Sequence, residues 1–364
     1  QFLFLGWVAC IHSSDGIWLL GYQKHKRRII KKMGITYRAL RVFEDNDNTF
    51  KREIVNMNTD DLPDHDLLIK VHYTSLNYKD TLSAYGNKGV TRKYPHTPGI
   101  DAAGVIVQSR SNRFEEGDEV ITGGYDLGMN TDGGFGEYIK VPTEWVLHKP
   151  MNMSLRESMI LGGTGYTAGL SVMNLTDHGI KPSDGPVLVT GAAGGVGSWS
   201  VLILKKLGFK VIAGTSNIDD SHDLINKLGA DEHVDKSVID IDPSRALLKW
   251  RWAGAIENVG GNVLATALRA CKPHGIVTAC GNIYSHELHM TVYPFILNGV
   301  KLIGISAQIT EIEERKRVWN LLATEYKTEL PGILREITLN ELPDALELSK
   351  NKKNRGQVLI RHDH

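Results

Sequence analysis

The sequence predicts an α/β protein in two parts, a compact and mostly β part followed by a doubly wound parallel sheet. Residues from Ile35 to about Lys149 form short strand-like runs separated by Gly, Pro and Asp. From about Ser154, helical and strand-like patterns alternate, which is typical of a parallel sheet with helices on both faces. The length of 364 residues also exceeds what one hydrophobic core usually holds, at roughly 100 to 200 residues per domain.

The strands of the first part are predicted from runs rich in β-branched and aromatic residues that lie between turn residues. These runs are "LLIKVHYTSL", "AAGVIV", "DEVITGG" and "EYIKVP". Their short length and close spacing predict a compact, mostly β domain.

The second part is predicted from strands that are apolar throughout, as expected when a parallel strand is buried on both faces. The strand candidates are "PVLVTG", "KVIAGTS", "GAIENVG", "GIVTACGN" and "KLIGISA". The helical crossovers between them are predicted at "SWSVLILKKLG", "SHDLINKLG" and "NVLATALRACKPHG". After Ser306 a further helix, "IEERKRVWNLLATEY", precedes a final strand near "GQVLIRH" that we expect to return to the first part.

Composition and charge argue against several classes of partner. The 42 basic residues balance the 42 acidic ones, so no general attraction to nucleic acid or to an acidic membrane is expected. Three cysteines, Cys10, Cys271 and Cys280, form neither a disulfide framework nor a zinc pattern, which favours a reducing compartment, the cytoplasm. We also expect no transmembrane span, because no stretch gives about 18 uninterrupted apolar residues.

Residues 1–32 have an unusual composition. The apolar run "QFLFLGWVAC" precedes the basic run "KHKRRIIKK", which is the reverse of the order in a secretory signal. We expect Met33 to start the natural protein and residues 1–32 to be an upstream or added segment. The alternative is a membrane-surface anchor, which the basic run would favour.

The glycine-rich bend in "VLVTGAAGGVGSWSVLILKKLG" is the strongest local signal. Gly191, Gly194 and Gly197 follow a predicted strand and open a predicted helix, in a G-x-x-G-x-x-G relative of the Rossmann fingerprint. Missing Cβ atoms let the backbone approach a pyrophosphate, whose charge the helix N-terminus stabilises. Lys205, Lys206 and Gly208 fit the end of that helix. The bend therefore predicts a dinucleotide site, with a tight structural turn as the alternative; the residues expected to hold the cofactor here are Gly191, Gly194, Gly195, Val196 and Gly197.

The turn after the second strand of the sheet indicates which dinucleotide is bound. An NAD-selective site places an acidic residue about 20 residues after the glycines, where it holds the ribose hydroxyls. Here the turn is Thr215, Ser216 and Asn217, whose hydroxyl and amide groups can donate to a 2′-phosphate. NADPH is therefore favoured, although no Arg or Lys lies at the turn and Asp219 and Asp220 follow closely.

A set of ordered motifs resembles a known family. "SLNYKD", "PGID", "GTGYTAG", "TGAAGGVGS" and "YPFILNGVKLIGISA" are similar to the medium-chain dehydrogenase/reductase superfamily from Met33 onward, and within it to the YhdH/YhfP quinone-oxidoreductase-like group, which includes acryloyl-CoA reductases. The resemblance implies a GroES-like, mostly β catalytic domain and a Rossmann NADP-binding domain. The expected bounds are 33–155 with 310–364 for the catalytic domain and 156–309 for the Rossmann domain.

The same resemblance argues against a metal. Zinc alcohol dehydrogenases of the superfamily carry Cys where this chain has Asn77 and His where it has Ile100, and no replacement ligand cluster is evident. His222 and His233 are expected on the surface. Without a Lewis acid, the expected substrate is one that is already electrophilic, such as a carbon–carbon double bond conjugated to a thioester or ketone.

By resemblance, Asn77 and Tyr78 lie at the cleft between the domains and are the expected catalytic residues. Tyr78 is expected mainly to contact the cofactor, with proton donation as the alternative, and Asn77 to donate a hydrogen bond to the developing enolate. A simple turn is the structural alternative for "NYKD", with Lys79 and Asp80 then structural. Tyr85 and Tyr94 are further candidates, and Asp101 is expected to be structural.

The resemblance also places Asn282, Ile296 and Ser306 beside the nicotinamide. The segment "YPFILNGVKLIGISA" is either a core strand or an edge that pairs two copies, and we expect a homodimer. A CoA substrate would bring phosphates to the cleft mouth, where the candidate cations are Lys88, Arg92 and Lys93; a solvated loop is the alternative.

Together these observations predict an NADPH-dependent, zinc-free reductase of activated double bonds that converts acryloyl-CoA to propionyl-CoA. A quinone or enone oxidoreductase with the same cofactor is the main alternative. A non-catalytic NADPH-binding protein is the third.

Overall fold

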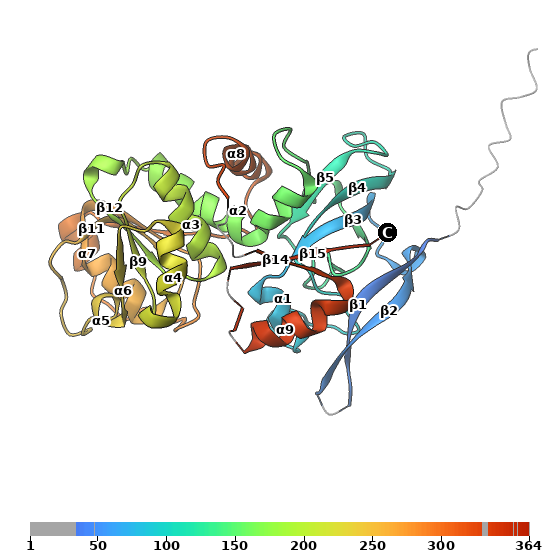
Figure 1. The fold of residues 1–364 in the computed structure, drawn as a ribbon, viewed down its shortest axis with the longest axis horizontal. Coiled ribbons are helices and arrows are strands. Elements are labelled where there is room, and N and C mark those ends of the chain that lie inside the picture. The colour runs from blue at the N-terminus through green and yellow to red at the C-terminus, as the bar shows by residue number, and fades with distance from the viewer. Residues whose placement is uncertain (1–33, 47, 330–333, 352, 355, 364) are drawn as a thin grey trace, which may run out of the picture. The chain divides into compact units, whose positions relative to one another are not determined.

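The structure is a computed structural model that describes residues 34–46, 48–329, 334–351, 353–354 and 356–363. Within it, Ile35–His364 form one compact unit. The question of whether residues 1–32 belong to the natural protein therefore falls outside the described residues. The architecture is mixed α/β, as predicted, with one largely antiparallel sheet and one parallel sheet (Figure 1).

The mostly β part opens with a hairpin and is dominated by a seven-stranded sheet. In the hairpin, β1 (Thr36–Glu44) pairs with β2 (Phe50–Asn58). The larger sheet has the order β14-β15-β3-β4-β5-β7, and β6 pairs with β3. Its strands are β3 (Leu67–Ser75), β4 (Asp101–Ser109), β5 (Glu119–Gly123), β6 (Tyr138–Val141), β7 (Val146–His148), β14 (Leu334–Thr338) and β15 (Gln357–Arg361). Since β15 pairs with β3, the predicted return of the final strand is confirmed.

The second sheet is parallel and has six strands in the order β10-β9-β8-β11-β12-β13. Every residue of β8, β9 and β11 is buried, which confirms the apolar-strand prediction. The strands are β8 (Val187–Thr190), β9 (Val211–Gly214), β10 (Glu232–Val234), β11 (Trp252–Glu257), β12 (Cys271–Ala279) and β13 (Lys301–Gly304). As the last strand in the order, β13 forms an edge of this sheet within the described chain.

Helices connect and cover the sheets, and one predicted boundary was wrong. The helices are α1 (Tyr78–Ala84), α2 (Leu155–Asp177), α3 (Gly195–Lys206), α4 (Ile218–Leu228), α5 (Lys236–Ile239), α6 (Gly261–Arg269), α7 (Tyr293–Asn298), α8 (Ile312–Ala323) and α9 (Leu342–Lys350). The helix expected through "NVLATALRACKPHG" ends at Arg269, and β12 begins at Cys271. Arg269 is buried, and its guanidinium donates to the backbone oxygens of Ile241, Asp242 and Arg245, so tertiary contacts fix the end of α6.

Helix α2 lies between the two sheets and contacts both (Figure 1). Ser154 caps it, accepting from the backbone N–H of Glu157, at the residue where the sequence pattern changes. Within the helix, Gly162 has φ 51° and ψ −155°, a conformation that L side chains rarely adopt. A Cβ there would lie 2.2 Å from Ser75 Oγ. The kink therefore requires glycine and brings α2 against the end of β3.

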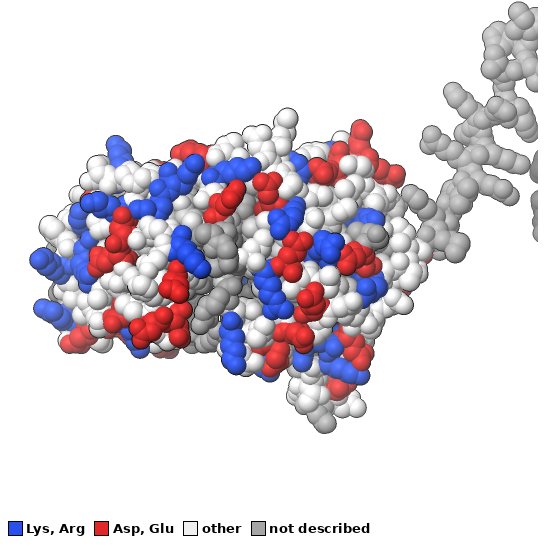
Figure 2. Space-filling view, viewed as in Figure 1, with Lys and Arg blue, Asp and Glu red and all other residues white. Residues whose placement is uncertain are grey.

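The outer surface carries both signs of charge. On the face shown in Figure 2, Lys and Arg side chains lie interspersed with Asp and Glu side chains. In the part of the chain that the structure describes, no helix has the length and apolar composition needed to cross a bilayer.

Candidate active site

The glycine bend lies between β8 and α3, as predicted. Gly191 has φ +57°, and Gly194 is the N-cap of α3. A Cβ on Gly197 would lie 2.2 Å from the carbonyl oxygen of Gly191, so the first turn of α3 packs directly on the preceding loop. In this fully described segment no side chain caps α3 and no acidic residue lies in its first turn. The backbone N–H groups of this turn therefore suit an anionic phosphate, so the bend fits a dinucleotide.

The turn after β9 contains the predicted residues Thr215, Ser216 and Asn217. One prediction about a residue beside this turn was wrong. His233, expected on the surface, is partly buried, and its Nε2 lies 2.8 Å from Thr215 Oγ1. Burial lowers the pKa of His233, and the nearby His222 lowers it further. Asn217 caps α4, with Asp219 and Asp220 in the first turn of that helix. The turn thus offers hydroxyl and amide groups beside two carboxylates.

One cavity of about 330 Å³ joins the two halves of the site. Residues from the mostly β part line one side, and residues that follow the strands of the parallel sheet line the other. From the predicted set it brings together Asn77, Tyr78, Val196 and Ser306. The other lining residues include Lys79, Ile100, Asp101, Tyr125, Trp145, Gly163, Tyr166, Cys280, Gln308 and Arg315.

Tyr78 and Asn77 differ in how freely they reach this cavity. The Tyr78 side chain is 48% exposed at the start of α1. Asn77 is buried, and its Nδ2 donates to Ser75 Oγ at 3.0 Å and to Asp101 Oδ2 at 3.0 Å. Nδ2 also donates to the Ser75 carbonyl oxygen at 3.3 Å, so both N–H bonds of the Asn77 amide have acceptors inside the protein. A hydrogen bond from Asn77 to substrate would have to replace one of these contacts, and it stays a prediction.

Asp101 organises this region and fits its predicted structural role. It is buried in β4 and accepts from the backbone N–H of Ser75 at 2.7 Å and of Gly163 at 2.9 Å. It also accepts from the side chains of Thr74, Ser75 and Asn77. One carboxylate thus holds the end of β3, the start of α1 and the kink of α2 together.

Asp80 is a second buried carboxyl group beside the cavity. Its Oδ2 accepts from the backbone N–H of Asn77 at 2.8 Å, and its Oδ1 accepts from those of Gly99 and Ile100. Burial, together with the nearby charge of Asp101, raises the pKa of Asp80 to about 7. Asp80 therefore joins the 99–100 loop to the N-terminus of α1. It takes part in the predicted local turn and also makes a long-range contact.

An aromatic and arginine wall, which the sequence analysis missed, forms another side of the cavity. The rings of Tyr125 and Trp145 stack with centroids 5.5 Å apart. Arg315 is buried between Tyr125 and Tyr166, and its guanidinium donates to the carbonyl oxygens of Gly123 and Ala307. These residues come from distant segments, and no motif in the sequence marks them as a group.

Several predicted residues lie away from the cavity. Asn282 is exposed, and Ile296 is 67% exposed on α7. The hydroxyls of Tyr85 and Tyr94 donate to Glu347 and to the Ser83 carbonyl, respectively. In the candidate CoA loop, Lys88 pairs with Glu44 at 2.6 Å, while Arg92 and Lys93 are exposed. The geometry thus gives the cavity a smaller set of residues than the sequence analysis proposed.

The residues expected to replace zinc ligands both line the cavity: Asn77 and Ile100. Among the described residues, no group of three or more His, Cys, Asp or Glu side chains is placed to hold a metal ion. Cys280 borders the cavity, and burial raises the pKa of its thiol to about 12. The expectation of a metal-free site stays a prediction.

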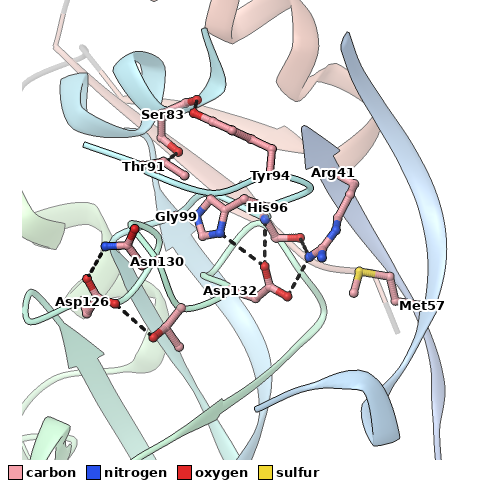
Figure 3. A network of polar contacts seen from close by, with 12 residues as sticks. Arg41, Met57, Ser83, Thr91, Tyr94, His96, Gly99, Asp126, Asn130 and Asp132 are labelled. Carbon is pink, nitrogen blue, oxygen red and sulfur yellow. Dashed lines mark hydrogen bonds and ion pairs between the residues drawn. The ribbon is translucent and has the colours of Figure 1, made fainter. Parts of the chain in front are cut away.

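A polar network supports the loop that contains His96 and Gly99 (Figure 3). Asp132 accepts from Arg41 Nη1 at 2.6 Å and from the backbone N–H of Thr97 at 2.9 Å, and its Oδ1 lies 3.4 Å from His96 Nδ1. Burial opposes ionisation of Asp132, but the contacts with His96 and Arg41 outweigh it and lower the pKa of this carboxyl below its usual value. The ionised carboxylate thus ties β1 to the 96–100 loop.

We expect Asp132→Asn to lower the free energy of unfolding by about 2 to 3 kcal/mol at pH 7, because it weakens charge-assisted hydrogen bonds. A carboxyl whose folded-state pKa is depressed stabilises the protein above its unfolded pKa of about 3.9, and this stabilisation is lost as the pH falls through the folded pKa. Urea unfolding at pH 7 and pH 3 should therefore show a smaller mutant effect at pH 3. Asp64→Asn, at an exposed ion pair with Arg110, is the control and should change little. Equal losses for Asp132→Asn at both pH values would contradict this role.

Comparison with known proteins adds the following matches. Residues 63–151 match the family model "Alcohol dehydrogenase GroES-like domain", and residues 195–324 match "Zinc-binding dehydrogenase". Acrylyl-CoA reductase AcuI of Ruegeria pomeroyi is 39% identical over 284 residues, which cover 78% of this chain and 86% of that protein.

Two solved structures are also similar to this chain over nearly their whole length. The yhdH oxidoreductase from Salmonella enterica in complex with NADP is 37% identical, with a TM-score of 0.84 and coverage of 89% of this chain and 99% of that one. Bacillus subtilis protein yhfP with NAD bound is 40% identical, with a TM-score of 0.87 and coverage of 90% and 99%.

Proposed function

Because the chain belongs to the medium-chain dehydrogenase/reductase family, we propose that it is an NADPH-dependent reductase of activated carbon–carbon double bonds, acting on acryloyl-CoA to give propionyl-CoA. The observation that carries the proposal is the cavity shared by Tyr78 on one side and by Val196 and Ser306 on the other. The names of the Ruegeria pomeroyi relative and of the NADP-bound Salmonella enterica structure support the substrate and the cofactor.

Within this proposal, the chain's residues bind and orient the reactants. When bound, NADPH supplies a hydride from its nicotinamide. Residues 191–197 would hold the pyrophosphate, the 215–217 turn the 2′-phosphate, and Tyr78 and Ser306 the nicotinamide end. Asn77, whose amide is engaged, would position the start of α1 against Asp101. The apolar and aromatic lining would keep water away from the acyl group.

We also propose the division into a catalytic domain, residues 33–155 with 310–364, and a cofactor domain, residues 156–309. The two sheets support it, since one is built from strands before 150 and after 333 and the other from strands between 187 and 304. The cytoplasmic location and the CoA-phosphate role of Lys88, Arg92 and Lys93 stay predictions.

Reduction of quinones or simple enones is the second candidate function. The stacked rings of Tyr125 and Trp145 give the cavity a flat aromatic surface, which suits a planar ring. A quinone would need the same cofactor but no recognition of CoA.

The experiment that tests the proposal follows NADPH consumption with acryloyl-CoA, crotonoyl-CoA and a benzoquinone side by side, and repeats the best substrate with NADH. Preference for acryloyl-CoA with NADPH is the expected result. Turnover of the quinone alone would favour the second function. NADPH binding without turnover of any acceptor would favour a non-catalytic binding protein.

We further propose that the protein forms a homodimer through β13 and α7. The outer edge of β13 has no partner strand within the described chain, and exposed apolar side chains gather beside it. These side chains are Val292, Tyr293, Ile296, Leu297 and Leu302. Antiparallel pairing of two β13 edges about a two-fold axis would cover this apolar surface.

We expect Leu297→Asp to convert the dimer to a monomer, because it places a charge within that surface. Size-exclusion chromatography with light scattering gives the mass of each species. Met151→Asp is the matched control, since Met151 is 97% exposed and lies outside the patch. A monomeric wild-type protein, or a dimer that survives Leu297→Asp, would refute the proposed interface.

A further inference from the structure

The proposed reduction needs a proton as well as a hydride. Proton donation is the alternative role of Tyr78, whereas Asn77 is expected only to donate a hydrogen bond, and its amide nitrogen contacts Ser75 and Asp101. Lys79 lies two residues after Asn77 and takes no part in the hydrogen bonds around Asp101. Its Nζ donates to Gln308 Oε1 at 3.0 Å, and Lys79 and Gln308 both line the cavity. An ammonium group has three N–H bonds. Within the described chain, this contact leaves N–H bonds of Lys79 available to the cavity.

The position of Lys79 is set by elements from both halves of the site. It is the second residue of α1, directly after Tyr78. Its partner Gln308 lies two residues after Ser306, and the backbone oxygen of Gln308 accepts from Tyr125 N at 2.7 Å. The ammonium group therefore lies in the same cavity as Tyr78 and Ser306, the two residues proposed to contact the nicotinamide end. On this geometry, and resting on the proposed function, we propose that Lys79 is the acid that protonates the α-carbon of the reduced substrate.

The other polar groups of the cavity suit this role less well. The Arg315 guanidinium is bound to two backbone carbonyls and does not lose a proton in proteins. The Asp101 carboxylate is surrounded by five hydrogen-bond donors. The Cys280 thiol has a pKa of about 12 because of burial. Lys79 is a cation that can give a proton to the substrate and then regain one from water.

The surroundings of Lys79 also make it a stronger acid than an ordinary lysine. Burial lowers its pKa, and the nearby Asp80 carboxyl acts in the opposite direction. The remaining titratable or charged groups that line the same cavity are Tyr78 on α1, Asp101 on β4, Tyr125 after β5, Tyr166 on α2, Cys280 after β12 and Arg315 on α8. A lysine whose pKa is lowered toward neutrality is a better general acid at physiological pH.

In this step, each bond that forms is matched by a bond that breaks. Hydride addition to the β-carbon, with NADPH as the reductant, forms a C–H bond and moves the π-electron pair onto the α-carbon and carbonyl oxygen. The α-carbon then takes a proton from the Lys79 ammonium, forming the second C–H bond. The broken N–H bond leaves its electron pair on nitrogen, and the neutral amine regains a proton from water.

Two substitutions separate proton donation from charge. Lys79→Met removes the ammonium, whereas Lys79→Arg keeps a positive charge that cannot donate a proton. We expect both to lower kcat with acryloyl-CoA at least about 100-fold, the usual scale of general acid catalysis. NADPH affinity, measured by fluorescence titration, should change little.

The pH profile distinguishes an acid from a merely structural residue. In the wild-type protein, kcat should fall tenfold per pH unit above the pKa of Lys79, and Lys79→Arg should abolish that fall. Lys51→Met, at an exposed lysine paired with Glu53 on the hairpin, is the matched control and should behave as wild type. Wild-type kcat with acryloyl-CoA in Lys79→Met, or an unchanged pH profile in Lys79→Arg, would overturn the proposal.

A second readout does not depend on turnover. Lysines methylated with ¹³C-formaldehyde give NMR signals that titrate, and the signal missing from Lys79→Arg belongs to Lys79. We expect it to titrate below the ordinary lysine value of about 10.4, and an ordinary titration would count against the proposal.

The substrate assignment is tested separately by including a simple enone. If wild type reduces the enone but not acryloyl-CoA, the proposed substrate fails while the enone rates of the Lys79 variants still decide the role of Lys79. If wild type reduces quinone alone, no α-carbon is protonated and the proposal for Lys79 is refuted.

Discussion

Gly197→Ala is expected to weaken NADPH binding at least about 100-fold, which corresponds to about 2.7 kcal/mol. The added Cβ would lie 2.2 Å from the Gly191 carbonyl oxygen and 2.7 Å from Ala192 Cα. Both obstacles are backbone atoms, so no side-chain rotation relieves the overlap. The first turn of α3 must move away from β8, and its N–H groups then no longer converge on a pyrophosphate.

Isothermal titration calorimetry with NADPH measures this effect, and circular dichroism checks that the fold is retained. Gly304→Ala is the matched control, because a Cβ at Gly304 meets no atom within 4 Å. Wild-type affinity in Gly197→Ala would mean that the cofactor does not bind at this bend.

Asp101→Ala is expected to lower the free energy of unfolding by about 3 to 5 kcal/mol and to remove activity. A buried carboxylate that accepts five hydrogen bonds is replaced by a methyl group, so the donors of Thr74, Ser75, Asn77 and Gly163 lose this acceptor. The kink of α2 at Gly162 then loses its tie to β4, and the walls of the cavity lose their fixed spacing.

Urea unfolding and steady-state kinetics measure the two effects. Asp101→Asn keeps one oxygen acceptor and should fall between wild type and Asp101→Ala in both. If Asp101→Ala were as stable as wild type, the carboxylate would not be the element that joins β3, α1 and α2.

The parallel sheet and its glycine bend could be predicted because their signals are local. In β8 all four residues are apolar or small enough to be buried, and Gly191 to Gly197 mark the bend that follows. The end of α6 could not be predicted in this way. Arg269 ends that helix through contacts to residues about 24 to 28 positions away, which a window of neighbouring residues does not contain.

In the candidate site, too, residues in local motifs could be predicted, whereas residues that depend on long-range contacts could not. Tyr78 and Ser306 were placed by motifs and do reach the cavity. Ile296, placed in the same way, is exposed on α7 instead. Arg315 and Gln308 were missed, because their role depends on contacts to Gly123 and Lys79, which lie about 190 and 230 residues away. Such contacts arise from the arrangement of the sheets and leave no periodic pattern in the sequence.

The place of β15 in the seven-stranded sheet has a consequence for how the protein is made. A ribosome releases the chain from its N-terminus, and domains generally fold as they emerge. When residue 304 has emerged, every strand of the parallel sheet is available, whereas β3 still lacks its neighbour β15 (Gln357–Arg361). During that interval the Tyr73–Ser75 end of β3, beyond the part that pairs with β6, presents an open edge of the kind that recruits other chains. The parallel sheet of the cofactor domain can therefore fold during translation. The seven-stranded sheet of the catalytic domain stays vulnerable to aggregation until β15 has been synthesised.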